Sequence, residues 1–158
     1  MDHSNFGVLD FGNADYGIMA QSMKLIIYTD GASRGNPGPA AYGFTISDGD
    51  GKLLHEEGKY IGKTTNNVAE YTAVLEALKH VKEKFAKEKP LRIELSADSK
   101  LVAEQLSGNY KVKAKHLKPI IEQIKILATK LGSVTYSHIL RYQNTIADKL
   151  ANQALDNR

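Results

Sequence analysis

The sequence predicts an α/β protein with one five-stranded mixed sheet, in the order 3-2-1-4-5, flanked by helices. Short runs rich in apolar and β-branched residues alternate with longer segments whose apolar residues recur at helical spacing. A Gly-Asp-Gly turn joins the second run to the third. Because helical segments separate the first, fourth and fifth runs, these strands can lie parallel, while the second and third form a hairpin on the other side of the first.

The elements are predicted in order from Lys24. Strand one should cover residues 24–30 and end at a loop of glycines and prolines, in which Pro37 and Gly38 fit the middle of a type II turn. The remaining strands are predicted at 40–48, 52–62, 91–98 and 133–140. Helices are predicted within 64–90, 99–108, 116–132 and 144–157, the last with Ile146, Leu150 and Leu155 among its apolar positions.

The composition suits a single folded domain. The chain has 158 residues, of which 42% are apolar and 25% charged. It contains no cysteine, which excludes disulfides, thiolate zinc sites and a cysteine nucleophile and favours a reducing compartment. We therefore expect a cytoplasmic protein that does not enter a membrane. We interpret residues 1–22, which lack the pattern of a signal peptide, as a flexible N-terminal extension of a domain at residues 23–158.

The positive charge is concentrated in one segment. The net charge is +3, and from Lys100 to Lys130 there are seven lysines against only Glu104 and Glu122. This excess would attract a polyanion such as a nucleic acid. The alternative is an ordinary solvated helix face.

Two aspartates end strands that the topology makes neighbours. Asp30 ends strand one and Asp98 ends strand four, so their backbones should lie roughly 5 Å apart at one edge of the sheet. Two carboxylates at that distance repel each other unless a cation lies between them. Each has a structural alternative, since Asp30 suits an Asx-turn and Asp98 suits the cap of the next helix.

Two further acids lie near helix starts. Glu70 follows Asn67 by three residues and Asp148 follows Thr145 by three, which is also the spacing of a capping box. If both helices start at the same edge of the sheet, four carboxylates converge. Oxygen ligands suit Mg²⁺ or Mn²⁺, and two such ions about 3.5 to 4 Å apart can clamp a phosphodiester during hydrolysis.

Four motifs then resemble one known family. The segments "YTDGASRGNPGPAAYG", "TTNNVAEYTAVLEAL", "LSADSKLVAEQL" and "NTIADKLANQAL" are similar, in order, to those of type 1 ribonuclease H, the ribonuclease HI family. The resemblance implies a ribonuclease H-like fold and an endonuclease that hydrolyses the RNA strand of RNA/DNA hybrids, leaving 5′-phosphate and 3′-hydroxyl ends. It also implies two Mg²⁺ or Mn²⁺ ions held by Asp30, Glu70, Asp98 and Asp148.

The resemblance also implies substrate contacts. Asn36, Asn66 and Asn67 match positions that contact the groove, where the 2′-hydroxyls of RNA are exposed. The same residues could instead be a turn residue and helix caps. Thr65, Lys100 and Arg141 are candidate phosphate contacts. Other members carry a loop histidine before the last acid; here we expect a structural role for His138 within strand five, and Arg141 lies nearer the loop.

Other functions remain open at this stage. The same metal centre could act on double-stranded RNA or on branched DNA, because a fold does not determine a substrate. A non-catalytic hybrid-binding module is a third possibility, although all four acids are present. We expect a monomer that needs no protein partner.

Overall fold

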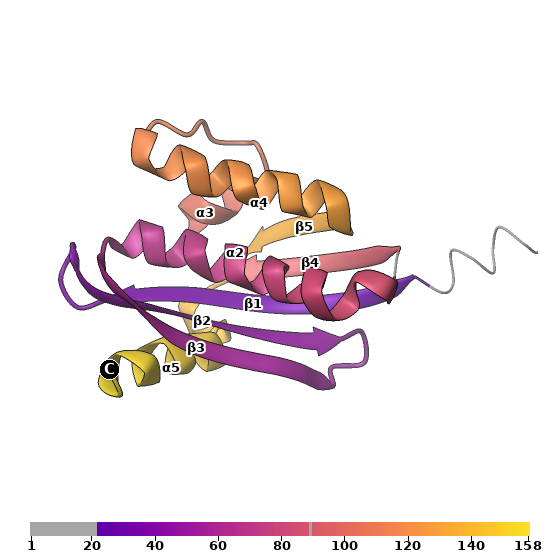
Figure 1. Cartoon of the computed structure of the whole chain (residues 1–158), viewed down its shortest axis with the longest axis horizontal. Coiled ribbons are helices and arrows are strands. Elements are labelled where there is room, and N and C mark those ends of the chain that lie inside the picture. Colours follow the sequence, from indigo (N-terminus) through magenta and orange to yellow (C-terminus); the bar gives the residue numbers. More distant parts are fainter. Residues whose placement is uncertain (1–21, 89) are drawn as a thin grey trace, which may run out of the picture.

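The computed structural model describes residues 22–88 and 90–158, and within them five strands form one mixed sheet in the order β3-β2-β1-β4-β5 (Figure 1). The predicted fold class and strand order are confirmed. Most of the predicted extension, residues 1–21, lies outside the described residues. The strands are β1 (Met23–Ser33), β2 (Gly38–Asp48), β3 (Leu53–Thr64), β4 (Leu91–Ala97) and β5 (Gly132–His138). The helices are α2 (Asn66–Phe85), α3 (Lys100–Leu106), α4 (Lys118–Leu131) and α5 (Thr145–Asp156), with short 3₁₀ turns η1 (Ala86–Glu88), η2 (Lys115–Leu117) and η3 (Arg141–Gln143).

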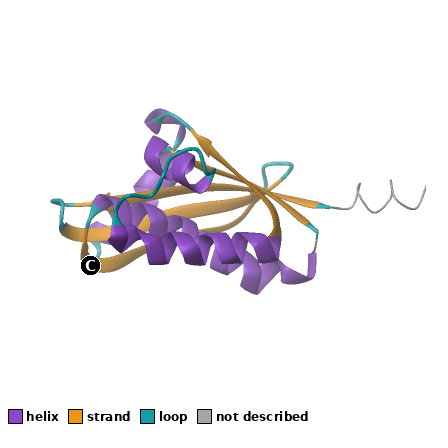
Figure 2. Ribbon diagram, turned by 90° about the horizontal axis from the view of Figure 1, so that it is seen from above, coloured by secondary structure: helices purple, strands orange, loops and turns teal. Residues whose placement is uncertain are grey.

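The strand directions follow the connections between them. β1 pairs antiparallel with β2 and parallel with β4, and β4 pairs parallel with β5. Helices α2, α3 and α4 belong to these connections, and Figure 1 shows α2 and α4 on one side of the sheet and α5 on the other. Seen from above, the strands run along the molecule and the helices lie along them (Figure 2).

The main core lies between the sheet and α2. Alternate residues of β1, among them Leu25 and Ile27, are fully buried against apolar side chains of α2 such as Val74 and Leu78. Burying side chains of this size stabilises the fold by about 1.5 to 3 kcal/mol each. The long helix is thereby held against the central strand, and its first turn lies where β1 leaves β4.

Two sequence predictions need correction here. β1 does not end at Asp30 but continues to Ser33, because Gly31, Ala32 and Ser33 still pair with β2. In α5, Ile146 is 59% exposed instead of facing the sheet. The buried positions of that helix are Ala147, Ala151 and Leu155, and the two alanines lie where the helix packs close to β2.

Within the described residues, no helix combines the length and the hydrophobicity that a membrane crossing requires.

Candidate active site

The pairing of β1 with β4 brings Asp30 and Asp98 together. The parallel register ends at Thr29 opposite Ala97, and the two aspartates are the next residue of each chain segment. Asp30 is only 4% exposed although it carries a carboxylate. The two acids therefore lie next to each other, as predicted, and the pairing of β1 with β4 ends just before them.

A glycine allows the third acid to join them. At Gly31, a Cβ atom would lie 2.3 Å from the carbonyl carbon of Ala69 and from the amide nitrogen of Glu70. Only a residue without a side chain lets α2 start this close to β1. As a result, Asp30, Glu70 and Asp98 have carboxylate oxygens that all lie within 4.8 Å of one another.

The capping alternatives for Glu70 and Asp98 do not hold. The cap of α2 is Thr65, whose hydroxyl accepts from Val68 N at 3.2 Å, so Asn67 and Glu70 form no capping box. The cap of α3 is Ser99, which accepts from Val102 N at 3.3 Å, and Asp98 does not cap it. Neither Glu70 nor Asp98 is needed for capping.

Asp148 approaches the same edge from the other face of the sheet. Gly43, which pairs with Asp30 across β1 and β2, has no room for a Cβ, because that atom would lie 2.3 Å from Ala147 O. This close packing brings the first turn of α5 next to Asp30, and the charge of Asp148 acts on it. Asp148 is nevertheless outside the group of three, and Asn152 Nδ2 donates to its Oδ1 at 3.2 Å.

The carboxylates repel one another in a poorly solvated place. Burial, followed by the charges of Asp98 and Asp148, raises the pKa of Asp30 to about 8. Burial and the charges of Asp30 and Asp98 also raise the pKa of Glu70 well above its usual value. Among the described residues, the buried Glu70 Oε2 has no hydrogen-bond partner. An all-oxygen cluster with an unsatisfied atom and excess negative charge has the chemistry that fits a hard divalent cation.

Asn144 positions the site, and the sequence did not reveal it. Its Nδ2 donates to Thr29 O at 2.8 Å and to Asp98 Oδ2 at 3.3 Å, and the residue is almost completely buried. It also occupies the cap position of α5, so the capping-box alternative, which gave that position to Thr145, does not explain Asp148. The signal available in the sequence was only that an amide residue stands directly before the helix.

The asparagines expected to contact RNA lie at the mouth of the site. Asn66 N donates to Asn36 Oδ1 at 3.1 Å, and Ser33 Oγ donates to Asn66 Oδ1 at 2.9 Å. The loop after β1 is thus tied to the start of α2. Asn36, Asn66 and Asn67 are all exposed. None of the three is the cap of α2, which is Thr65.

The loop between β1 and β2 differs from the predicted turn. Gly38 does not have the positive φ that a type II turn requires there; Gly35 has it instead, at 93°. Gly38 is required for another reason, since a Cβ would lie 2.1 Å from Arg34 O. The Asn36–Pro37 peptide bond is cis.

A groove leads from Asn67 toward the lysine-rich segment. Its volume is about 580 Å³, and its lining includes Asn67, Tyr110, Lys111 and Lys113. Both lysines are exposed in the loop that follows α3. A basic surface therefore begins beside the acidic cluster.

The other predicted contacts are more scattered. Lys100 is exposed at the first position of α3, two residues after Asp98, and Arg141 is exposed at the start of η3. His138 lies in β5 as expected, opposite Ala97, although the strand ends there and not at residue 140, and its side chain is exposed. Burial therefore does not support the structural role that we expected for it.

Comparison with known proteins identifies the family. Residues 28–154 match the family model described as "Reverse transcriptase-like". The sequence is 42% identical over 133 residues to ribonuclease HI of Halobacterium salinarum, covering 84% of this chain and 65% of that protein. The chain belongs to the type 1 ribonuclease H family. The resemblance stated from the four motifs is thus confirmed.

A solved type 1 ribonuclease H shows the same fold. The crystal structure of LC11-RNase H1 in complex with an RNA/DNA hybrid superimposes with a TM-score of 0.81 at 42% sequence identity, covering 84% of this chain and 97% of that one. The chain is also 42% identical over 135 residues to a bifunctional protein of Mycobacterium tuberculosis. That match covers 85% of this chain but 36% of the mycobacterial protein, so the chain spans about a third of that relative's length.

Proposed function

We propose that this protein is an endonuclease that hydrolyses the RNA strand of RNA/DNA hybrids in a reaction that requires divalent metal ions. The observation that carries the proposal is the grouping of buried Asp30 with half-buried Glu70 and Asp98, each of which offers one carboxylate oxygen within 4.8 Å of the others. Family membership and the hybrid bound by the similar LC11-RNase H1 support the choice of substrate.

The acids have different places in the proposed metal centre. Asp30, Glu70 and Asp98 would hold Mg²⁺ or Mn²⁺, and Asp148, which lies near Asp30 on α5, would complete a set of four ligands for two ions. When bound, such ions supply a lowered pKa for the attacking water and stabilise the negative charge on the leaving oxygen. The products would be a 5′-phosphate and a 3′-hydroxyl end.

Two of the acids must ionise before they can bind a metal ion, and a neighbouring amide keeps the site in position. Asp30 and Glu70 must lose the protons that their raised pKa values favour, and the energy for this comes from ligation. Asn144 keeps Asp98 and the β1 backbone in register through its two hydrogen bonds. No covalent intermediate on the protein is required.

Recognition of RNA would come from the exposed residues around this centre. Asn36, Asn66 and Asn67 present amide groups suited to the 2′-hydroxyls in the wide, shallow groove of an A-like duplex. Lys111 and Lys113 line the groove beside Asn67 and would contact the phosphate backbone. Thr65, Lys100 and Arg141 are further phosphate contacts in this proposal. We also propose that the protein acts as a monomer without an obligatory protein partner, and its cytoplasmic location stays a prediction.

A comparison of substrates tests the proposal. Labelled RNA/DNA hybrid, double-stranded RNA and DNA duplexes of one sequence are incubated with the protein and with Mg²⁺ or Mn²⁺. We expect cleavage of the RNA in the hybrid and an intact DNA duplex. Efficient cleavage of double-stranded RNA would broaden the substrate, and binding of the hybrid without cleavage under either ion would favour a non-catalytic module.

A further inference from the structure

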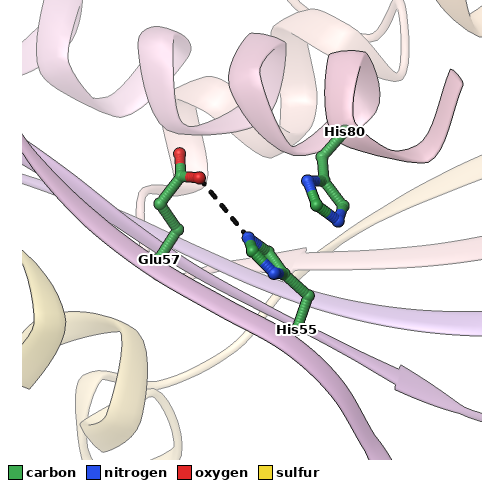
Figure 3. Close-up of side chains that lie close together, drawn as sticks. All are labelled: His55, Glu57 and His80. Atoms are coloured by element: carbon green, nitrogen blue, oxygen red, sulfur yellow. Dashed lines mark hydrogen bonds and ion pairs between the residues drawn. The ribbon is translucent and has the colours of Figure 1, made fainter. Parts of the chain in front are cut away.

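A second cluster with metal-binding chemistry lies between β3 and α2 (Figure 3). His55 and Glu57 are two residues apart on β3, so their side chains leave the same face of the strand. His80 projects toward them from α2 (Figure 3). One ligand atom from each of these three side chains lies within 4.8 Å of the others.

This histidine cluster, His55, Glu57 and His80, is separate from the carboxylates. His80 follows Glu70 by ten residues on α2. A rise of 1.5 Å per residue puts roughly 15 Å between these two positions along the helix axis. The cluster belongs to the edge strand β3, whereas Asp30 and Asp98 belong to β1 and to the end of β4.

The neighbouring side chains hold the cluster in place. The His55 and His80 rings are stacked, with centroids 3.7 Å apart and planes 14° apart. Phe44 packs beside both rings, at 5.7 Å and 6.3 Å between centroids. The Tyr42 hydroxyl donates to Glu57 Oε2 at 2.6 Å, and Glu57 Oε1 lies 3.4 Å from His55 Nε2. A hydrogen bond such as the one from the Tyr42 hydroxyl orients a carboxylate that binds a metal.

The electrostatics favour a neutral His80 ring with an available lone pair. Burial and the neighbouring His55 lower the pKa of His80, while Glu57 and Glu83 act in the opposite direction and Lys84 in the same one. A metal ion needs the neutral form of histidine, so little proton release is required at neutral pH. His55 and Glu57 keep about a third of their side-chain surface exposed, which leaves an ion a way in.

We propose that His55, Glu57 and His80 bind one divalent transition-metal ion, best matched to Zn²⁺, that links edge strand β3 to helix α2. Two imidazole nitrogens and one carboxylate oxygen, with a fourth position open to water, form a donor set that zinc favours and Mg²⁺ does not. Metal–ligand bonds of about 2.0 Å put neighbouring tetrahedral ligands about 3.3 Å apart, so the side chains must close in by at most about 1.5 Å. The two rings must also turn out of their stacked arrangement, because the lone pair of an imidazole nitrogen lies in the plane of its ring and parallel rings do not point at one ion. Rotation of the partly exposed side chains supplies both movements.

Binding at this place would stabilise the folded state. The ion would join the outer strand of the sheet to the long helix, and ligands that bind only the folded state raise the thermal midpoint. This inference concerns a site that takes no part in the proposed hydrolysis, so it stands or falls independently of that activity.

The test is calorimetric titration of Zn²⁺ into the full chain without a polyhistidine tag. Excess Mg²⁺ is present to occupy the carboxylates. We expect one Zn²⁺ per chain, a higher thermal midpoint, and with Co²⁺ the visible absorption of a four-coordinate nitrogen-containing site. His55→Gln and His80→Gln should each abolish this binding. Tyr42→Phe, which frees Glu57, should weaken it about 10- to 100-fold.

A matched control keeps the result specific. His116→Gln changes an exposed histidine of η2 outside the cluster and should leave the Zn²⁺ affinity unchanged. Circular dichroism checks that each variant is folded, and Glu57→Gln serves as an independent ligand variant if a histidine change prevents folding. The proposal is overturned if the wild-type chain shows no saturable Zn²⁺ binding, or if binding persists when either histidine or Glu57 is replaced.

Discussion

Burial shifts the pKa values in the two clusters along α2 in opposite directions. Near its start, Glu70 meets Asp30 and Asp98, and burial pushes the pKa values of Glu70 and Asp30 upward. Farther along, His80 stacks on His55, and burial pushes its pKa downward. In both cases the neutral form is favoured, because a poorly solvated environment disfavours charge.

The consequence for metal binding differs. Neutral carboxylic acids are poor ligands, so the carboxylate cluster must lose protons when a cation binds. Glu70 Oε2, which has no hydrogen-bond partner in the described part of the chain, then gains a partner. Neutral imidazole is already the form that binds metal. One helix thus carries a site suited to a hard, oxygen-seeking ion and another suited to a nitrogen-seeking ion, with different dependence on pH.

The largest expected effect comes from a mutation that removes the function of the carboxylate cluster and leaves the histidine cluster intact. Asp30→Asn should reduce hydrolysis of a hybrid on the order of 1,000-fold or more, because it removes the central carboxylate of the proposed metal centre. Zn²⁺ binding at the histidine cluster should be unchanged. Steady-state cleavage assays and zinc titration measure the two effects, and Asp50→Asn, in the exposed β2–β3 turn, is the matched control.

The next effect concerns the start of α2 alone. Gly31→Ala should destabilise the protein by about 2 to 3 kcal/mol, because its Cβ would lie 2.3 Å from the Ala69 backbone and force the helix start away. Cleavage should fall with it. Gly49→Ala is the control, since its Cβ meets only the Lys24 side chain, at 3.4 Å or more. Urea unfolding curves that coincide for the two variants would show that close packing at Gly31 is not required.

The two clusters should also respond differently to pH. Because the pKa of Asp30 is raised to about 8, its protonated form stabilises the metal-free protein fully below the unfolded-state value near 4, and this contribution is lost as pH rises through about 8. Relative to Asp30→Asn, the metal-free wild type should therefore lose on the order of 5 kcal/mol between pH 4 and pH 8, since each pKa unit corresponds to about 1.4 kcal/mol.

Metal affinities measured over the same range sharpen the contrast. Mg²⁺ affinity should rise up to about pH 8 as the acids ionise. Zn²⁺ affinity should change little between pH 7 and pH 8, because the pKa of His80 already lies below its usual 6.5. Parallel curves for the two metals would contradict the distinction between the clusters.

The smallest effect should come from the basic groove. Lys111→Ala should weaken hybrid binding several-fold and lower the slope of log affinity against log salt by about 1, as expected for one lost phosphate contact. Lys52→Ala, at the distant β2–β3 turn, should change neither quantity. Binding is measured by fluorescence anisotropy in Ca²⁺ to prevent turnover. Equal slopes for all three proteins would place the duplex elsewhere.

The sequence predicted what depends on local pattern and on topology. Strand order followed from which runs were separated by helices, and the meeting of Asp30 with Asp98 followed from that order. The sequence could not show that β1 continues past Asp30, because pairing of Gly31 to Ser33 with β2 depends on the partner strand. It also could not show that Ile146 faces outward, because that depends on how closely α5 approaches Gly43.

The missed residues were missed for a similar reason. Asn144 looks like an ordinary residue before a helix, and its importance comes from reaching Thr29, 115 residues earlier. His55 and Glu57 lie on a strand that shows no motif. His80 lies on a helix that the sequence predicts only from the spacing of its apolar residues. Their proximity arises only once β3 is placed below α2, and that placement belongs to the tertiary structure (Figure 3).

The most direct test of the central claim is cleavage of an end-labelled RNA/DNA hybrid by the wild type and by Asp30→Asn, with and without Mg²⁺ or Mn²⁺. The account predicts RNA fragments with 3′-hydroxyl ends from the wild type only when metal is present, and none from folded Asp30→Asn. Metal-independent cleavage, or cleavage by Asp30→Asn at the wild-type rate, would contradict it.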